Sequence, residues 1–139
     1  TWENSAILAA QQGTDQKVYC STFFDENDDS GLAATFVKGF KEFLNSDPQN
    51  LTNNGGNDIV AAVSALGYDA YMTAIEAIKL AQSTSGEDIQ AALFNVDFDA
   101  VTGHITIKAD TGDANKTEAY IKQADNGAFA FVKRQSVEG

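Results

Sequence analysis

The side chains that most readily do chemistry are rare in this sequence. Cys20 is the only cysteine and His104 the only histidine, which excludes an internal disulfide, a cysteine-based zinc site and a multi-histidine metal site. A nucleophilic Cys20 needs a base, and His104 is the only imidazole that can serve as one. Cys20 lies among β-branched and aromatic residues, and His104 follows Gly103 in a second strand-like run. We therefore interpret Cys20 as a small buried hydrophobic side chain and His104 as exposed or hydrogen-bonded, and we predict no catalytic residue.

An acidic segment carries part of a calcium-binding pattern. Asp25, Asn27 and Asp29 stand at the alternating positions of an EF-hand loop. Ser30 and Phe36 stand where that loop requires a glycine and a bidentate glutamate. The segment is therefore predicted to be a solvated acidic cap for the helix that follows it.

The remaining candidate loops are also incomplete. Asp110-Thr111-Gly112-Asp113 has the composition of a β-turn, and Gly55-Gly56 lacks the preceding strand and the Lys-Ser/Thr of a phosphate loop. Glu118, Asp125 and Glu138 show no spacing that places two carboxylates at one site. The sequence thus predicts no metal site and no cofactor.

Composition limits the class of protein and its partners. The 139 residues include 20 acidic and nine basic side chains, a net charge of −11, which argues against nucleic acid or an anionic membrane as the main partner. An apolar fraction of 43% with 10% aromatic residues is too high for a disordered acidic chain. The length fits one domain, and no apolar run approaches the roughly 20 residues of a membrane-spanning helix.

The periodicity of apolar residues predicts a strand, then three helices, then three strands. A short helical or loop segment at 2–12 precedes a strand at 18–24, and the later strands cover 104–108, 119–124 and 128–133. The helices begin after Ser30, near residue 58 and after Ser85, with a polar loop at 49–57. Ser85 and Asp88 are expected to form a capping box, and Asn126-Gly127 a hairpin turn.

Two of the predicted helices have wide apolar faces. The first carries an apolar stripe that ends before Asp47-Pro48, and the second is expected to run over 58–81. Members of the first stripe are Leu32, Phe36, Phe40, Phe43 and Leu44. Because few short strands are available, these helices are expected to cover a sheet that the chain does not fully supply. The alternative is a helical bundle with a hairpin attached.

Seven segments, in the same order, resemble those of type I periplasmic binding proteins. The closest branch is the substrate-binding proteins of branched-chain amino acid ABC transporters, and the resemblance covers nearly the whole chain but only the C-terminal portion of a family member. The segments are Val18-Tyr19-Cys20-Ser21-Thr22-Phe23-Phe24, Phe36-Val37-Lys38-Gly39-Phe40, Gly67-Tyr68-Asp69-Ala70 with Glu76-Ala77-Ile78, Asp88-Ile89-Gln90-Ala91-Ala92-Leu93, Thr102-Gly103-His104-Ile105-Thr106-Ile107, Asp110-Thr111-Gly112-Asp113 and Asn126-Gly127.

The resemblance implies an α/β fold, the C-terminal portion of a two-lobe structure with helices covering a parallel sheet and a C-terminal hairpin. Residues 1–17 would end the second lobe, 18–24 would cross a hinge, and 25–103 would supply the helical part of the first lobe. Residues 104–110 would cross back, and 111–139 would form the second-lobe hairpin. The hinge residues implied in this way are Ser21, Thr22, Phe23, Ile105 and Thr106.

The resemblance also implies where a ligand would bind. Trp2 would line the cleft, and Ala62, Val63 and Ser64 would offer contacts from the first lobe, although Val63 equally fits the apolar stripe of its helix. The family's acidic residue that binds the ligand's ammonium group would precede Thr1.

These implications add up to a solute-binding protein without catalytic activity. It would work outside the cytoplasm, in the periplasm or as a cell-surface lipoprotein, and deliver an amino acid or similar small solute to an ABC permease. The N-terminal part of the same protein, or a second copy of the chain, would complete its fold. The alternatives are the ligand-binding ectodomain of a signalling receptor and, less favoured, an enzyme that uses Cys20 or His104.

Overall fold

A computed structural model describes residues 3, 5–29 and 31–136 of the chain, Ser5 through its backbone alone. The chain forms two units. The sheet unit comprises Thr1–Asp25 and Thr117–Gly139, and the helical unit comprises Glu26–Lys116. The chain therefore passes between the units twice. The first crossing lies between Asp25 and Glu26, and the second lies between Lys116 and Thr117.

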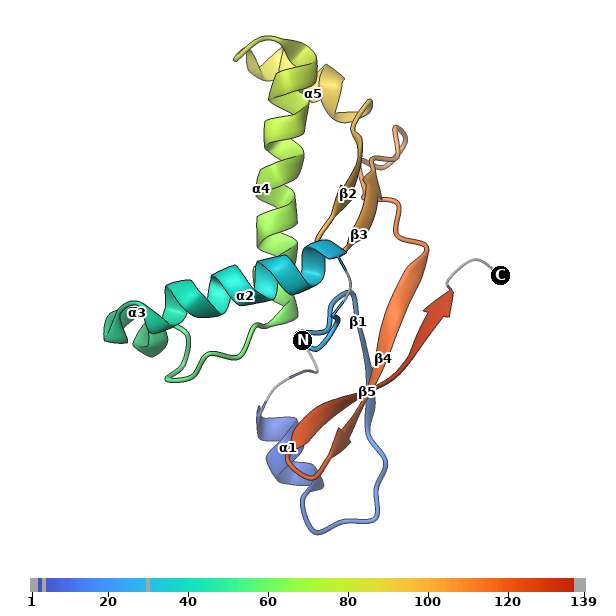
Figure 1. Ribbon diagram of the computed structural model, residues 1–139. Coiled ribbons are helices and arrows are strands. Elements are labelled where there is room, and N and C mark those ends of the chain that lie inside the picture. The colour runs from blue at the N-terminus through green and yellow to red at the C-terminus, as the bar shows by residue number, and fades with distance from the viewer. Residues whose placement is uncertain (1–2, 4, 30, 137–139) are drawn as a thin grey trace. The chain divides into compact units, whose positions relative to one another are not determined.

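The sheet unit is a three-stranded antiparallel sheet with the order β1-β4-β5 (Figure 1). Its elements are α1 (Ser5–Gln11), β1 (Tyr19–Thr22), β4 (Glu118–Asp125) and β5 (Ala128–Ser136). Asn126 and Gly127, with φ of 48° and 82°, form the turn between β4 and β5. A two-residue hairpin loop of this kind needs left-handed backbone at both positions, so the predicted Asn-Gly turn is confirmed.

The pairing of β4 with β5 contains one irregularity. Lys122 lies opposite Phe131, whereas Ile121 lies opposite Lys133, so Val132 is an extra residue in β5. Such a β-bulge inserts one residue on one strand while the pairs on either side remain intact. Beyond the bulge Arg134 lies opposite Tyr120, with its guanidinium carbon 5.1 Å from the centre of the Tyr120 ring.

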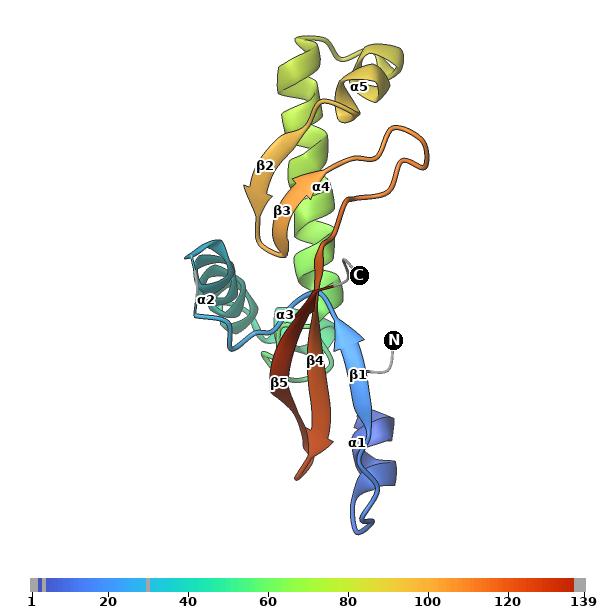
Figure 2. The same ribbon diagram turned by 90° about the vertical axis from the view of Figure 1, so that its right-hand side faces the viewer.

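The helical unit is arranged around one long helix. Its helices are α2 (Gly31–Asn45), α3 (Pro48–Asn53), α4 (Ala62–Ala81) and α5 (Gly86–Leu93), and its strands are β2 (Asp97–Ala100) and β3 (Gly103–Thr106). The β2–β3 hairpin lies alongside α4, as the two views in Figures 1 and 2 agree, and α5 packs against α4. Ala77, Ala92 and Val96 form a small buried cluster between these elements.

Two helix boundaries differ from the sequence prediction. The segment predicted as a polar loop at 49–57 contains α3, because Pro48 stands at the first helical position and the Asp47 carboxylate accepts a hydrogen bond from Gln49 N at 2.8 Å. Helix α4 begins at Ala62, four residues later than predicted, and the residue before it, Ala61, has extended backbone. The predicted capping box is also wrong: Ser85 is the N-cap of α5, but its side chain makes no capping hydrogen bond.

Much of the apolar surface of the helical unit is not covered. Phe43, Val63 and Tyr71 are 57%, 59% and 65% exposed, and no large side chain among the described residues is fully buried. The alternative of a helical bundle does not form. Helix α4 packs against α5, whereas α2 contacts α4 through the rings of Phe36 and Tyr68. The observed mixture of helices and strands agrees with the predicted α/β class.

Candidate functional site

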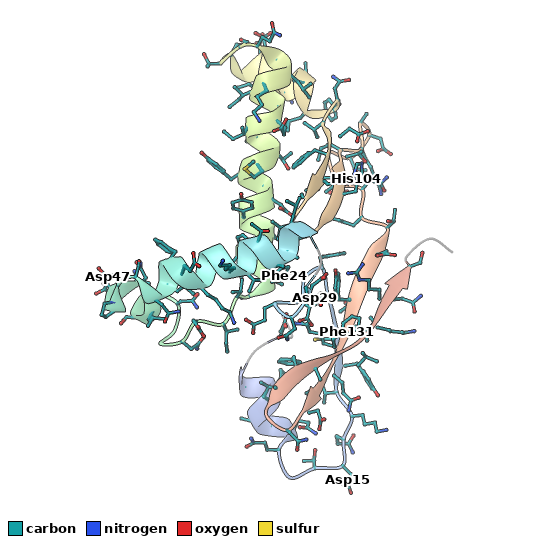
Figure 3. The ribbon with its side chains drawn as sticks, in the orientation of Figure 1. Asp15, Phe24, Asp29, Asp47, His104 and Phe131 are labelled. Atoms are coloured by element: carbon teal, nitrogen blue, oxygen red, sulfur yellow. The ribbon has the colours of Figure 1, made fainter. Side chains whose placement is uncertain are left out.

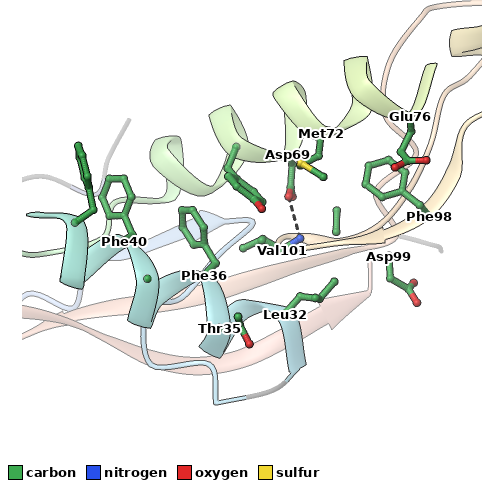
Figure 4. Close-up of a pocket in the computed structure, with 14 residues that line it drawn as sticks. Leu32, Thr35, Phe36, Phe40, Asp69, Met72, Glu76, Phe98, Asp99 and Val101 are labelled. Carbon is green, nitrogen blue, oxygen red and sulfur yellow. Dashed lines mark hydrogen bonds between the residues drawn. The ribbon is translucent and has the colours of Figure 1, made fainter. Parts of the chain in front are cut away.

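An apolar groove of about 680 Å³ lies in the helical unit between α2, α4 and β2 (Figure 4). We call it the α2–α4 groove. Its apolar lining includes Leu32, Phe36 and Phe40 from α2, Met72 from α4, and Phe98 from β2. This volume is within the range of small-molecule pockets. The predicted ligand contacts Ala62, Val63 and Ser64 do not line it, so the groove and the predicted binding residues are separate features.

Aromatic side chains on α2 form one wall of the groove. Phe36 stacks on Phe40 with ring centres 5.5 Å apart, Phe40 lies 6.4 Å from Phe43, and Phe36 meets Tyr68 of α4 at 5.0 Å. These distances suit offset and tilted ring packing. Helical spacing of three and four residues places the three phenylalanines on one side of α2, as the sequence pattern predicts.

A buried carboxylate anchors the turn between β2 and β3. Asp69 on α4 is 2% exposed; its Oδ1 accepts a hydrogen bond from Val101 N at 2.9 Å. Its Oδ2 accepts from Thr102 N at 2.7 Å and from the Thr102 hydroxyl at 2.6 Å. Figure 4 draws the bond to Val101. A buried charge is stable only when hydrogen-bonded in this way, so Asp69 fixes the turn to the helix.

Lys116 extends this network toward the second crossing. Its Nζ donates to the Thr102 hydroxyl at 2.7 Å and to the Thr102 carbonyl at 3.0 Å. Burial lowers the pKa of Lys116, and the nearby Asp69 charge opposes that shift. In the sequence Asp69 stands out only as part of the Gly67-Tyr68-Asp69-Ala70 motif. The missed signal was its place four residues from Ala65 and Thr73, on the buried side of α4.

The start of α4 carries the three predicted ligand contacts that can be described. Ala62 and Ser64 are half-buried, and Val63 is exposed. Ala61 caps the helix without a side-chain hydrogen bond, and the first turn has no acidic residue. The backbone N–H groups of this turn therefore carry partial positive charge. Trp2, the fourth predicted contact, lies outside the described residues.

The predicted hinge residues fall in both units. Ser21 and Thr22 lie in β1, opposite Ile121 and Tyr120, and Phe23 follows them shortly before the first crossing. Ile105 and Thr106 lie in β3, inside the helical unit. Ile105 is buried opposite Phe98, and Thr106 O accepts a hydrogen bond from Asn115 N at 2.8 Å. The second crossing comes ten residues after Thr106.

Cys20 and His104 lie in different units, and the pKa of each is raised. Burial, together with the Glu3 carboxylate, raises the pKa of the Cys20 thiol against the effect of Lys122, which favours the protonated thiol. His104 is exposed on the β2–β3 hairpin (Figure 3), and its Nδ1 and Nε2 lie 2.8 Å and 3.0 Å from Asp99 and Asp97. The Asp99 hydrogen bond is the main cause that raises the pKa of His104.

The acidic segment departs from its prediction at its first residue. Asp25 is 2% exposed, and its Oδ2 lies 3.3 Å from Nζ of Lys122, so it is a buried ion-pair partner rather than part of a solvated cap. Within the described ranges, no group of three or more His, Cys, Asp or Glu residues is arranged to hold a metal ion. No helix in that part of the chain is both long and apolar enough to cross a membrane.

A known protein family and solved structures resemble this chain in sequence and in fold. Residues 1–128 match the family model described as periplasmic binding protein. A leucine-binding protein, LivK, from Thermotoga maritima has a similar structure, with a TM-score of 0.74 and 25% identity over 98% of this chain and 35% of that one. No curated protein sequence matches the chain.

A second solved structure shares the fold alone. It is an ABC transporter solute-binding protein from R. palustris in complex with benzoate, with a TM-score of 0.67 and 13% identity, and the match covers 96% of this chain and 34% of that one. The chain thus spans about a third of the length of each of these structures.

Proposed function

This chain belongs to the periplasmic binding protein family, as its motifs predict, and we propose that it forms part of a protein that captures an amino acid for an ABC permease. Proteins of this family bind solutes outside the cytoplasm. The observation that carries the amino-acid assignment is the similarity of nearly the whole chain to a leucine-binding protein. A branched-chain amino acid or a similar small solute is the expected ligand.

The binding contribution of this chain is proposed to lie at the start of α4. Val63 is 59% exposed and is not part of the described core, which leaves its side chain available to an apolar ligand group. Ser64 and the N–H groups of the first helical turn supply polar contacts nearby, and the helix N-terminus favours a ligand carboxylate. Ala62 and Trp2 would complete the contacts made by this chain. Affinity would come from burial and hydrogen bonding without covalent chemistry.

The α2–α4 groove is proposed to receive other polypeptide of the same protein. Phe43 in its wall is exposed, and Phe36 and Phe40 are only half-buried. Among the described strands β2 pairs only with β3, so an added strand can extend this small sheet. The similar structures are about three times as long as this chain, which supports an occupant from the same protein. The helical unit has 14 acidic and five basic residues, so like charge disfavours a second copy as the occupant when the rest of the same protein is present.

Two crossings between units suit rigid-body closure around a ligand. We propose that the residues beside the first crossing, Ser21 to Phe23, take part in that motion. Ile105 and Thr106 are proposed to transmit it from inside the helical unit.

Calorimetric titration of the full-length gene product tests the proposal. Leucine, isoleucine and valine are expected to bind, and benzoate serves as a comparison ligand. Val63→Ala is expected to weaken binding by roughly tenfold, because it removes apolar contact with the ligand. The matched control is Leu80→Ala, an exposed apolar residue near the other end of α4. Absence of binding for every amino acid tested would refute the assignment.

A further inference from the structure

The helical unit begins and ends with a charged side chain that is bonded back into the unit. Glu26 is its first residue and Lys116 its last. Glu26 Oε2 accepts a hydrogen bond from Val60 N at 3.2 Å and lies 3.0 Å from Nζ of Lys41 on α2. Lys116 donates two hydrogen bonds to Thr102. Both side chains are half-buried, so solvent weakens these contacts less than it weakens surface ion pairs.

We call Glu26 and Lys116, with the bonds just described, the two anchors of the helical unit. Each anchor connects a crossing to α4. Val60 is buried two residues before α4 begins, so Glu26 ties the first crossing to the entry of that helix. Lys116 reaches α4 through the Thr102 hydroxyl, which accepts from Lys116 and donates to Asp69. The longest helix of the unit is thereby linked to both points where the chain leaves the unit.

Neither anchor is needed to close a secondary-structure element. Glu26 precedes α2, and Lys116 follows a loop that is already held by the bond from Asn115 N to Thr106 O. Hydrogen bonds to charged groups are stronger than neutral ones and hold a fixed direction. What these two contacts do is fix the direction in which the backbone enters and leaves the helical unit.

We propose that Glu26 and Lys116 are positioning residues that confine bending between the two units to the backbone on the outer side of each. The inference rests on the proposed function, because it assigns the limits of the hinge that ligand closure would use. Residues 26–116 move as one body, including Ile105 and Thr106. Backbone rotation occurs before Glu26 and after Lys116.

Variants that cut each anchor test this in the full-length gene product without added solute. Lys116→Met removes both bonds to Thr102, with Lys108→Met, an exposed lysine of the same segment, as its matched control. Glu26→Ala removes the other anchor, with the exposed Glu42→Ala on α2 as its control. Thr102→Val removes the hydroxyl that joins Lys116 to Asp69, whereas Thr102→Ser keeps a hydroxyl at that position.

Two measurements report the effect. Spin labels at Gln90→Cys on α5 and Ala130→Cys on β5, in a Cys20→Ala background, give the distribution of distances between the units. Hydrogen exchange reports local opening beside each crossing, around Asp25 and Glu26 at the first and over residues 103–117 at the second. The anchor variants are expected to broaden the distance distribution and to speed exchange beside the affected crossing by about tenfold. The control variants and Thr102→Ser should behave as the wild type.

The outcomes separate this proposal from the proposed function. Unchanged distance distributions in Lys116→Met and Glu26→Ala overturn it, even if these variants melt at lower temperature, because that result shows a structural role only. If one variant does not fold, the other still decides, since the two anchors are independent. Broadened distributions in a protein that binds no amino acid would support the anchors and count against the ligand assignment alone.

Discussion

The two units satisfy their buried charges in opposite ways. In the sheet unit Lys122 is 5% exposed, with its Nζ 2.5 Å from Glu3 and 3.3 Å from Asp25. In the helical unit Asp69 has a hydroxyl and two backbone N–H groups as its donors. The sheet unit thus uses ionic partners, which join segments far apart in the sequence. The helical unit uses neutral donors, which fix a turn to a helix.

The surfaces of the units differ in the same sense. The sheet unit has six acidic and four basic residues, whereas the helical unit is strongly acidic and carries the α2–α4 groove. In the sheet unit the buried charges pair with one another, whereas the helical unit combines an excess of acidic residues with an uncovered apolar groove.

Asp69→Ala should destabilise the helical unit by about 4 kcal/mol, because it leaves the buried N–H group of Thr102 and the part-buried N–H group of Val101 without an acceptor. Chemical denaturation of the full-length protein measures the loss. Exchange of these two amides should rise while exchange in β4 stays unchanged. Asp88→Ala, an exposed acid on α5, is the control. A loss below about 1 kcal/mol would mean that water replaces the carboxylate.

Lys122→Met should destabilise the sheet unit by about 2–3 kcal/mol. Methionine keeps most of the apolar stem but leaves Asp25 buried beside Glu3 without the cation, and Glu3 can turn partly toward solvent. Exchange in β1 and β4 should rise, with no change around Thr102. Lys133→Met on the exposed part of β5 is the matched control. Equal stability of both variants would show that the ionic centre is dispensable.

The isolated 139-residue chain should associate with itself or with a complementary fragment, because the groove is uncovered. Phe43→Lys should weaken self-association by about tenfold, since it removes an apolar contact from the helical unit. Phe131→Lys on β5 should have less effect. Analytical ultracentrifugation measures both variants. A wild-type chain that sediments as a monomer and melts cooperatively would contradict the idea that the groove needs an occupant.

The smallest effect concerns the His104 cluster of the helical unit. Because its folded pKa is raised, the contribution of His104 to stability is fully present below the unfolded pKa of about 6.5 and is lost as pH rises through the folded value. NMR titration should show Asp99→Asn lowering the pKa more than Asp97→Asn. A His104 pKa at or below that of the unfolded chain would exclude the two-carboxylate arrangement.

Local chemistry explains which parts of the fold the sequence predicts correctly. Asn126-Gly127 identifies the hairpin because the turn depends on these two residues alone. The family resemblance succeeds for the same reason, since its motifs are short and ordered. Asp47-Pro48 shows the limit of such signals. Proline after a capping residue can start a helix as well as end one, and here it does both.

The candidate site was less predictable because its contacts are long-range. Asp69 bonds to residues more than 30 positions away, and periodicity says nothing about which loop will meet a helix. Lys122 sits in a strand where alternation gives its face but not its ionic partners. Asp25 was expected in solvent because its neighbours are acidic, yet its burial depends on a lysine near the other end of the chain.

The extra residue in β5, Val132, makes this strand tolerant of a one-residue deletion. Since Val132 has no partner while its neighbours Phe131 and Lys133 already face consecutive residues of β4, removing it would leave every facing pair in place. Arg134 would still meet Tyr120. The middle of a strand is ordinarily where shortening the gene by one codon does most harm. Here the loss of one residue would reduce the local twist of the strand while keeping its facing pairs.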